Sequence, residues 1–165
     1  MSRRFIVAIA AIAVLGVSAS AVAQGTPKVR IVGKTVFKPG KFVKDTQRFK
    51  ARVITVTSGQ QFSWVNQAKA QDPHTISLVN KLPKSFDCEE CGAYEAKHAV
   101  DDNGEPANPV VDEGAQGFDT PGGDSVAIPP GGKGSGKILV SAPAGTTLKY
   151  LCLIHPWMQA RIKVK

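Results

Sequence analysis

The sequence of 165 residues predicts an all-β protein folded as a β-sandwich of seven to eight short strands, with one long irregular insert. Three observations support this prediction. Short alternating or β-branched runs recur along the chain, turn dipeptides such as Pro39-Gly40 and Ser58-Gly59 separate them, and sustained helical periodicity is almost lacking. This combination is typical of two packed sheets around one core.

Residues 1–23 have the composition of a secretory signal peptide. Two arginines give a basic start, the stretch 5–17 is apolar, and Ala21-Val22-Ala23 is a small-residue cleavage site. An uncleaved anchor is the competing interpretation, but the apolar run is short for a membrane span. We therefore expect residues 24–165 to form a single exported domain, periplasmic or extracellular, without a membrane span after cleavage.

The predicted strands before the insert begin with the run 28–37, which a glycine interrupts and Pro39-Gly40 ends. The basic, weakly patterned stretch 41–50 is expected to be a loop or an irregular edge. The runs 52–57 and 61–66 follow, joined by a short turn, and they predict a hairpin or a tight corner.

The next run, 74–78, begins directly after Asp72-Pro73 and alternates in polarity. Its first residue, His74, therefore shares the inward face with the two aliphatic residues of the run, whereas Thr75 and Ser77 point outward. Four further strands are predicted at 125–128, 136–141, 147–152 and 160–165.

The segment 82–124 is the irregular insert, rich in Gly, Pro, Asn and acidic residues. One helical turn is predicted near 95–100. A loop of this length in a compact domain is usually functional or disordered. Because the insert leaves the strand that begins at His74, it begins toward the opposite end of the sandwich, but its forty residues are enough to fold back. We expect it to be peripheral to the candidate metal ligands.

The formal net charge of +8 conceals a strong asymmetry. Between positions 85 and 124 eleven acidic residues stand against Lys97 alone, whereas the rest of residues 24–165 has eighteen Lys and Arg against Asp45 and Asp72. A body of about +16 therefore carries an insert of about −10. Basic residues commonly coat outer strand faces, and an exported chain without a recognition motif is not expected to bind nucleic acid.

Candidate metal ligands stand close together near the end of the chain. Cys152, His155 and Met158 follow one another at three-residue steps, and alternation in the run 147–152 directs the cysteine toward the core. Pro156 stiffens the loop between them. A thiolate, an imidazole and a thioether are three of the four ligands of a blue-copper site, which has two His, one Cys and a weak axial Met.

The second nitrogen ligand is predicted to be His74. A lone inward histidine is more often a hydrogen-bonded core residue, but here the downstream loop lacks one nitrogen ligand and His74 can supply it. His98, in the insert, is the remaining candidate.

With these four residues the chain resembles the cupredoxins, the small blue-copper proteins. The resemblance covers about 52–78 and 125–165, and the spacing of Cys152, His155 and Met158 is similar to that of amicyanin. It implies a Greek-key sandwich with one type 1 copper ion at one end. Two departures are Thr75, where the family commonly has an Asn that ties the ligand loops together, and the long insert.

Three cysteines leave one unpaired if two form a disulfide. For Cys88 and Cys91 the interpretations are a disulfide, a second metal site with His98, and a thioredoxin-like redox pair. The last lacks a βαβ setting, and the flanking acidic residues oppose a second thiolate, so we favour the disulfide.

The predicted function is electron transfer by an exported copper protein that is not an enzyme. The expected partner is a c-type cytochrome or an exported oxidoreductase, bound transiently by a monomer through an apolar patch where the edge of His155 reaches the surface. A copper carrier or storage protein is the alternative. A copper nitrite reductase is rejected, because it needs a second domain and more histidines than the three present.

Overall fold

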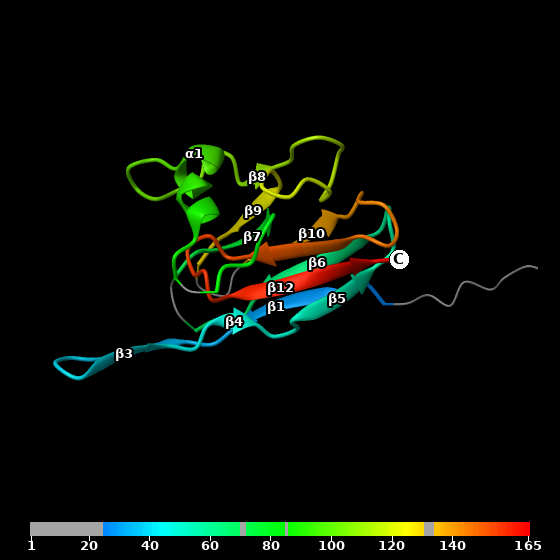
Figure 1. The fold of residues 1–165 in the computed structure, drawn as a ribbon. Coiled ribbons are helices and arrows are strands. Elements are labelled where there is room, and N and C mark those ends of the chain that lie inside the picture. The colour runs from blue at the N-terminus through cyan, green and yellow to red at the C-terminus, as the bar shows by residue number, and fades with distance from the viewer. Residues whose placement is uncertain (1–24, 70–71, 85, 131–133) are drawn as a thin grey trace, which may run out of the picture.

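The computed structural model describes residues 25–69, 72–84, 86–130 and 134–165, so the predicted signal peptide lies outside the described residues. Two β-sheets pack as a sandwich (Figure 1). One sheet has the strand order β10-β6-β1-β4 and the other β5-β12-β11-β7-β9-β8, while β2 and β3 form a separate hairpin. The predicted all-β sandwich is confirmed.

The strands of the four-stranded sheet are β1 (Lys28–Val32), β4 (Arg48–Phe49), β6 (Gln61–Asn66) and β10 (Ser135–Leu139). Those of the six-stranded sheet are β5 (Val53–Val56), β7 (His74–Val79), β8 (Val110–Val111), β9 (Ser125–Ile128), β11 (Thr147–Leu151) and β12 (Gln159–Val164). The hairpin consists of β2 (Thr35–Lys38) and β3 (Phe42–Asp45).

Most predicted strands are present, and the differences concern the edges. The glycine within 28–37 separates β1 from β2, because Gly33 has a φ of 120° and an added Cβ would collide with the backbone of Thr46. The stretch 41–50 contains β3 and β4 and is not simply a loop. β5 and β6 lie in different sheets, so the short turn between them is a corner and not a hairpin.

The core lies between the inner faces of the two sheets. Alternate residues of β6, β11 and β12 point into it, including Phe62, Tyr150 and Ile162, each fully buried. The ring of Tyr150 packs on Phe49 of β4, with 4.9 Å between the ring centroids. Burial of such large side chains is the main stabilising contribution to a sandwich of this size.

The insert forms a third layer on the outer face of the six-stranded sheet (Figure 1). It contains a 3₁₀ helix (η1, Glu89–Ala93), the short helix α1 (Tyr94–His98) and β8. The predicted helical turn is thus present. All six residues of β7 are buried, so Thr75 and Ser77 do point away from the core, but they face the insert and not solvent.

Of the two courses left open for the insert, the structure shows the one that returns toward the end of the sandwich that contains His74. The segment folds back, because Leu82, Tyr94 and the two cysteines of the insert pack on a small apolar cluster formed by Val79, Leu151 and Leu153. α1 and the β11–β12 loop therefore lie at the same end of the sandwich (Figure 1).

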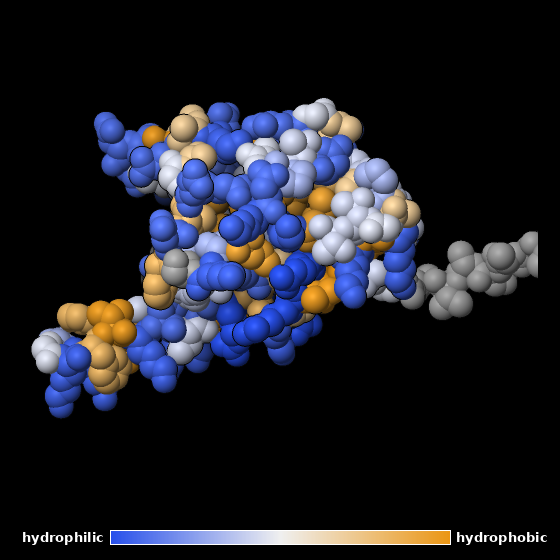
Figure 2. Space-filling model, viewed as in Figure 1, coloured by the Kyte–Doolittle hydropathy of each residue, from blue (hydrophilic) through white to orange (hydrophobic). Residues whose placement is uncertain are grey.

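The β2–β3 hairpin projects from this same end of the molecule (Figure 1). It has three exposed apolar side chains, with Phe37 at 68%, Val43 at 65% and Phe42 at 44% exposure, and apolar atoms gather over the hairpin in Figure 2. Within the described ranges, no helix is long and apolar enough to cross a membrane.

Candidate metal centre

The loop after β11 brings its three candidate ligands together through the backbone. The Met158 N–H donates to the carbonyl of His155 (2.8 Å), and the His155 N–H donates to that of Cys152 (3.2 Å). The Cys152 N–H in turn donates to the Met158 carbonyl (3.0 Å), which closes the loop. Cys152 and Met158 are fully buried, and both belong to the main core cluster.

The fourth candidate, His74, is the first residue of β7, which pairs with β11. This pairing places His74 beside the loop. Its Nδ1 lies 3.9 Å from Cys152 Sγ, and His155 Nδ1 lies 3.5 Å from the same sulfur. The ligand atoms of His74, Cys152 and His155 all lie within 4.8 Å of one another. Residues 78 positions apart are thus brought together as the sequence predicted.

The pKa shifts of His74, His155 and Cys152 bear on whether these side chains can bind a metal ion. Burial, together with the nearby His155, lowers the pKa of His74 to about 4. Burial also lowers the pKa of His155, against the opposing effect of Asp45 and Asp72. Both imidazoles are therefore neutral at pH 7 and can donate a lone pair. Burial raises the pKa of the Cys152 thiol, so a positive ion is needed to stabilise its thiolate.

The donor set fits copper better than zinc or a hard cation. Two imidazoles, one thiolate and a buried thioether combine nitrogen with soft sulfur, as in trigonal His₂Cys sites with a weak axial Met. His74 Nε2, on the far edge of its ring, has no hydrogen-bond partner among the described residues. A copper ion on Nδ1 would leave this N–H on Nε2, available to a water molecule.

Thr75 ties the two ligand segments together. Its backbone N–H donates to Cys152 Sγ (3.3 Å), and its hydroxyl accepts the N–H of Leu153 (2.8 Å). The threonine therefore links the strand that begins at His74 to the residue that follows Cys152. This is the linking role that the family resemblance assigns to an Asn at this position.

Two carboxylates beside His155 were not predicted. Asp45 at the base of the hairpin and Asp72 have carboxylate oxygens within 4.8 Å of a nitrogen of His155, and Asp72 Oδ2 lies 4.0 Å from Nε2. Gln47 holds them in place by donating to both, at 3.0 and 2.8 Å. In the sequence, Asp72 was assigned only to a turn. Its position two residues before His74 was the one indication that its carboxylate lies near the candidate ligands.

The edge of His155 is less accessible than expected. The residue is 6% exposed, and Trp157 covers it, with 5.1 Å between the ring centroids. Trp157 in turn contacts Phe86 of the insert, with centroids 5.4 Å apart. Trp157 and Phe86 are 40% and 76% exposed, so these two rings, and not the imidazole, form the apolar surface directly over His155.

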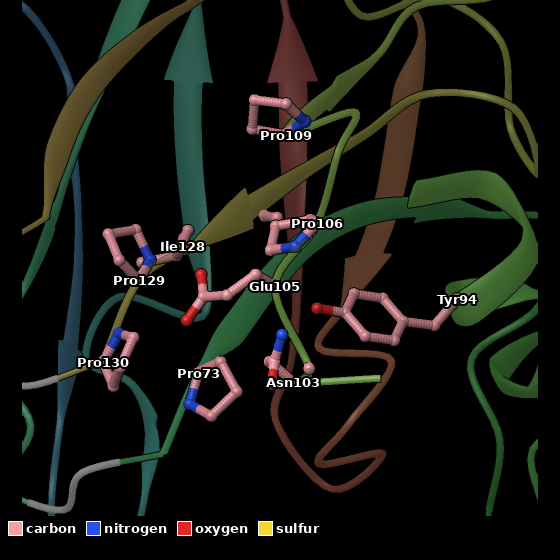
Figure 3. A pocket seen from close by; sticks show the side chains of 11 residues that line it. Pro73, Tyr94, Asn103, Glu105, Pro106, Pro109, Ile128, Pro129 and Pro130 are labelled. Carbon is pink, nitrogen blue, oxygen red and sulfur yellow. The ribbon is translucent and has the colours of Figure 1, made fainter. Parts of the chain in front are cut away.

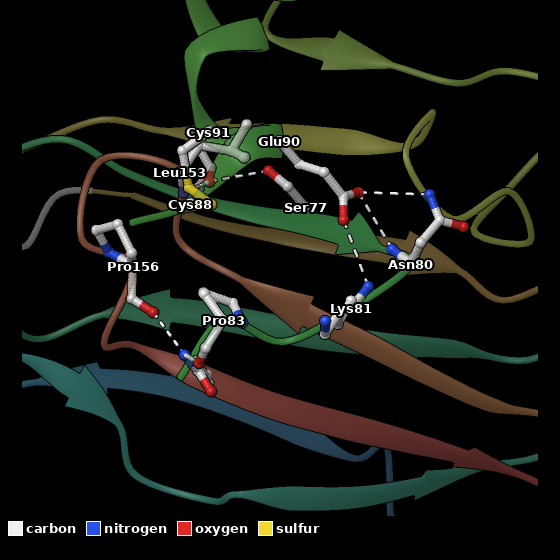
Figure 4. Close-up of a disulfide and its surroundings, with 11 residues drawn as sticks. Ser77, Asn80, Lys81, Pro83, Cys88, Glu90, Cys91, Leu153 and Pro156 are labelled. Atoms are coloured by element: carbon white, nitrogen blue, oxygen red, sulfur yellow. Dashed lines mark hydrogen bonds between the residues drawn. A yellow bond between two sulfur atoms is a disulfide. The ribbon is translucent and has the colours of Figure 1, made fainter. Parts of the chain in front are cut away.

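His98 does not join the candidate ligands. Both of its ring nitrogens are engaged, Nδ1 with the Asn108 carbonyl (2.6 Å) and Nε2 with Ser125 Oγ (2.8 Å). The predicted disulfide between Cys88 and Cys91 is confirmed, which leaves Cys152 as the free cysteine of the three. The disulfide packs beside Leu153, next to the ligand loop (Figure 4).

A separate cavity of about 500 Å³ lies between the insert and the end of β9. Figure 3 shows that proline rings, the phenol of Tyr94 and the carboxylate of Glu105 surround it. Pro73 lines it, but the candidate ligand His74 does not. The cavity is therefore adjacent to the metal centre and not part of it.

Comparison with known proteins gave structural matches only. No protein-family model and no curated protein matches the sequence. One similar structure is auracyanin A, a "blue" copper protein from Chloroflexus aurantiacus, with 20% identity and a TM-score of 0.46 over 86% of this chain and 100% of that one. Another is auracyanin from Roseiflexus castenholzii, with 17% identity and a TM-score of 0.44 over 86% and 99%.

A purple cupredoxin from Nitrosopumilus maritimus has 14% identity and a TM-score of 0.43 over 84% of this chain and 99% of that one. The chain forms a β-sandwich, and its buried His-Cys-His-Met group fits a single type 1 copper ion.

Proposed function

We propose that this protein is an exported electron-transfer protein that binds one copper ion through His74, Cys152, His155 and Met158. The observation that carries the proposal is the burial of these residues in a set of hydrogen bonds that already holds them together. A bound copper ion would supply one-electron exchange between Cu(II) and Cu(I). The chain's role is to keep the donor atoms in place so that little moves when the charge changes.

The surroundings of the ligands support this role. Apolar side chains keep water from the sulfur, and the backbone N–H of Thr75 donates to it at 3.3 Å. Both features set how readily a copper thiolate accepts an electron. Trp157 and Phe86 form an exposed apolar patch over His155, which suits brief contact with a redox partner such as a c-type cytochrome or an exported oxidoreductase.

The carrier alternative has less support. Its second ion would need Cys88, Cys91 and His98, but the two thiols form a disulfide and both nitrogens of the histidine are hydrogen-bonded. An enzymatic role would need an open coordination position for a substrate, whereas the four proposed ligands are at most 6% exposed. A monomeric protein that is not an enzyme therefore remains our proposal.

The test is copper loading of the purified protein, followed by absorption spectroscopy and voltammetry. We expect one tightly bound copper per chain, an intense visible band and a reversible one-electron wave. Colourless binding of Cu(I) alone would favour the carrier. The substitution Cys152→Ser should abolish the visible band, because it removes the thiolate, and a band that persists would refute the ligand assignment.

Met158→Leu provides the matched substitution at the axial position. The variant should remain coloured, and its midpoint potential should rise because loss of the weak thioether donor disfavours Cu(II). A potential equal to that of the unmodified protein would show that the Met158 sulfur does not contact the metal.

A further inference from the structure

A chain of buried polar side chains connects the insert to the candidate ligand loop. His98 Nε2 lies 2.8 Å from Ser125 Oγ, which lies 2.5 Å from Ser77 Oγ. The Ser77 hydroxyl donates to Thr75 Oγ1 at 2.9 Å. All four residues are at most 2% exposed. Hydroxyls buried in this way are held in a small number of hydrogen-bond arrangements.

The two ends of this hydrogen-bonded series of side chains, His98 and Thr75, have different hydrogen-bond partners. At one end His98 Nδ1 lies 2.6 Å from the Asn108 carbonyl, which can only accept, so this nitrogen carries a proton. At the other end Thr75 Oγ1 accepts the N–H of Leu153, and the Thr75 backbone N–H donates to Cys152 Sγ (3.3 Å). Burial raises the pKa of the Cys152 thiol, and the adjacent Thr75 side chain opposes that shift. Along this series, the proton that can be gained or lost is the one on His98 Nε2.

The charge of His98 determines the direction of every hydroxyl in the chain, because each hydroxyl has one proton. When Nε2 is protonated it donates to Ser125, Ser125 donates to Ser77, and Ser77 donates to Thr75. The Thr75 proton is then free for the sulfur. When Nε2 is unprotonated, Ser125 donates to it, the order reverses, and the Thr75 proton turns toward Ser77.

We propose that His98 is a positioning residue for the Cys152 thiolate: acting through Ser125 and Ser77, it controls whether the Thr75 hydroxyl donates to the sulfur. This inference rests on the proposed copper site and deepens it. A hydrogen bond to the sulfur withdraws electron density from the metal and favours Cu(I). The midpoint potential should therefore rise when His98 becomes protonated, and reduction should in turn favour that protonation.

The groups around His98 determine the pH range in which it becomes protonated. Burial lowers its pKa, and Lys97 adds to that effect while the Asn108 carbonyl opposes it. Lys97 is paired with Glu113 at 2.9 Å, and Tyr94 of the same helix stacks on the imidazole. Asp124, beside Ser125 on β9, accepts three backbone N–H groups. Tyr94 also lines the adjacent cavity, through which water can approach this side of the insert.

The test measures midpoint potential and histidine titration from pH 4 to 8 in the copper-loaded protein and in Ser77→Ala. In the unmodified protein the potential should rise with falling pH over the range in which His98 titrates. In Ser77→Ala the histidine should still titrate, whereas this part of the response should disappear. Thr75→Val, matched by Thr75→Ser to retain the hydroxyl, repeats the test if Ser77→Ala does not fold.

A second measurement does not need copper. In nitrogen-15 NMR spectra of the metal-free protein, the Leu153 amide should shift with the His98 titration, and it should cease to do so in Ser77→Ala. If protonation of His155 caused the Leu153 amide shift, the shift would persist in Ser77→Ala. The variant therefore distinguishes an effect of His155 from one transmitted through the hydroxyls.

Three results would overturn the inference: a potential that is constant while His98 titrates, a response unchanged in Ser77→Ala, or a His98 that stays neutral until the protein unfolds. A protein that binds no copper or shows no visible band would refute the proposed function. The amide titration of the metal-free protein would then still report on the hydroxyl chain itself.

Discussion

His74 connects the metal centre to the stability of the fold. It is fully buried, and its lowered pKa means that the folded protein takes up a proton here less readily than the unfolded chain. The same direction holds for His98 and His155. Each of these histidines therefore stabilises the fold only while it is neutral.

The metal-free protein should lose stability on acidification. Between the unfolded value of 6.5 and about 4 for His74, the unfolded state binds more protons, so the free energy of unfolding falls as the pH falls and levels off below about 4. The full effect of a shift of this size is about 3 kcal/mol. Urea unfolding at a series of pH values measures it.

His74→Gln is the control for this prediction. The variant keeps every carboxylate of the unmodified protein, so the difference between the two proteins isolates the histidine. If the two pH profiles are parallel, the imidazole of His74 is not buried in its neutral form.

At the scale of the elements, β7 shows what the sequence could and could not predict. Its inward residues were identified correctly by alternation, and so was the position of His74 at its start. The polar residues Thr75 and Ser77 were assigned to solvent, because alternation distinguishes two faces but not what covers them. The insert that covers them has no periodicity from which its packing could be inferred.

The short edge strands β3, β4 and β8 were missed for a related reason. β4 and β8 have two residues each, and β3 is mostly exposed, so they lack the repeated apolar positions that mark a strand. Cys152, His155 and Met158 were proposed as ligands because they stand at three-residue steps in one loop, and His74 because it begins a strand with its side chain on the inward face. The carboxylates beside His155 were not predicted, since the hairpin that brings Asp45 there was not foreseen.

The disulfide lies in the insert, which packs against the ligand loop. Cys88 and Cys91 pack with Leu82 and Tyr94 against Leu153, the neighbour of Cys152, and Glu90 between them accepts the backbone N–H groups of Asn80 and Lys81 (Figure 4). The bridge spans only three residues, so its effect on the unfolded chain is small and its main contribution is local.

Replacing both cysteines with serine should therefore loosen the insert without abolishing the fold. We expect the variant to fold with its visible band retained after copper loading, and amide exchange to accelerate in the insert and at Leu153. The core strand β12 should be unaffected and serves as the internal control. Acceleration spread evenly over both sheets would contradict a local role.

At the scale of the whole molecule, the two charged regions lie on either side of the ligand loop. The insert, with its acidic excess, occupies one side, and the β2–β3 hairpin, with exposed lysines at 38, 41 and 44, projects on the other (Figure 1). Contacts of Asp45 and Gln47 with Asp72 and His155 hold the base of the hairpin at the metal centre. A charged partner approaching this end therefore meets a directional field.

The rate of electron exchange with small charged reagents should reveal this field. Changing Lys38, Lys41 and Lys44 to glutamine should slow exchange with the hexacyanoferrate anion at low salt, and the rates should converge at high salt as the field is screened. Changing the exposed Glu89, Glu95 and Asp102 to their amides should have the opposite effect and provides the matched control. Equal rates in all three proteins at low salt would exclude steering.

The face of the six-stranded sheet beneath the insert includes polar residues that would also be suited to contact with water. Thr75, Ser77 and Ser125 would be satisfied by water if the segment were absent, as on the outside of an ordinary two-layer sandwich. The small apolar cluster of Val79, Leu151 and Leu153 would need polar replacements, and the space that Phe118 of the insert fills beside Phe62 in the main core would need another side chain. A two-layer sandwich could therefore gain or lose this layer through a limited set of substitutions, while the residues beneath it change from solvent-exposed to buried positions.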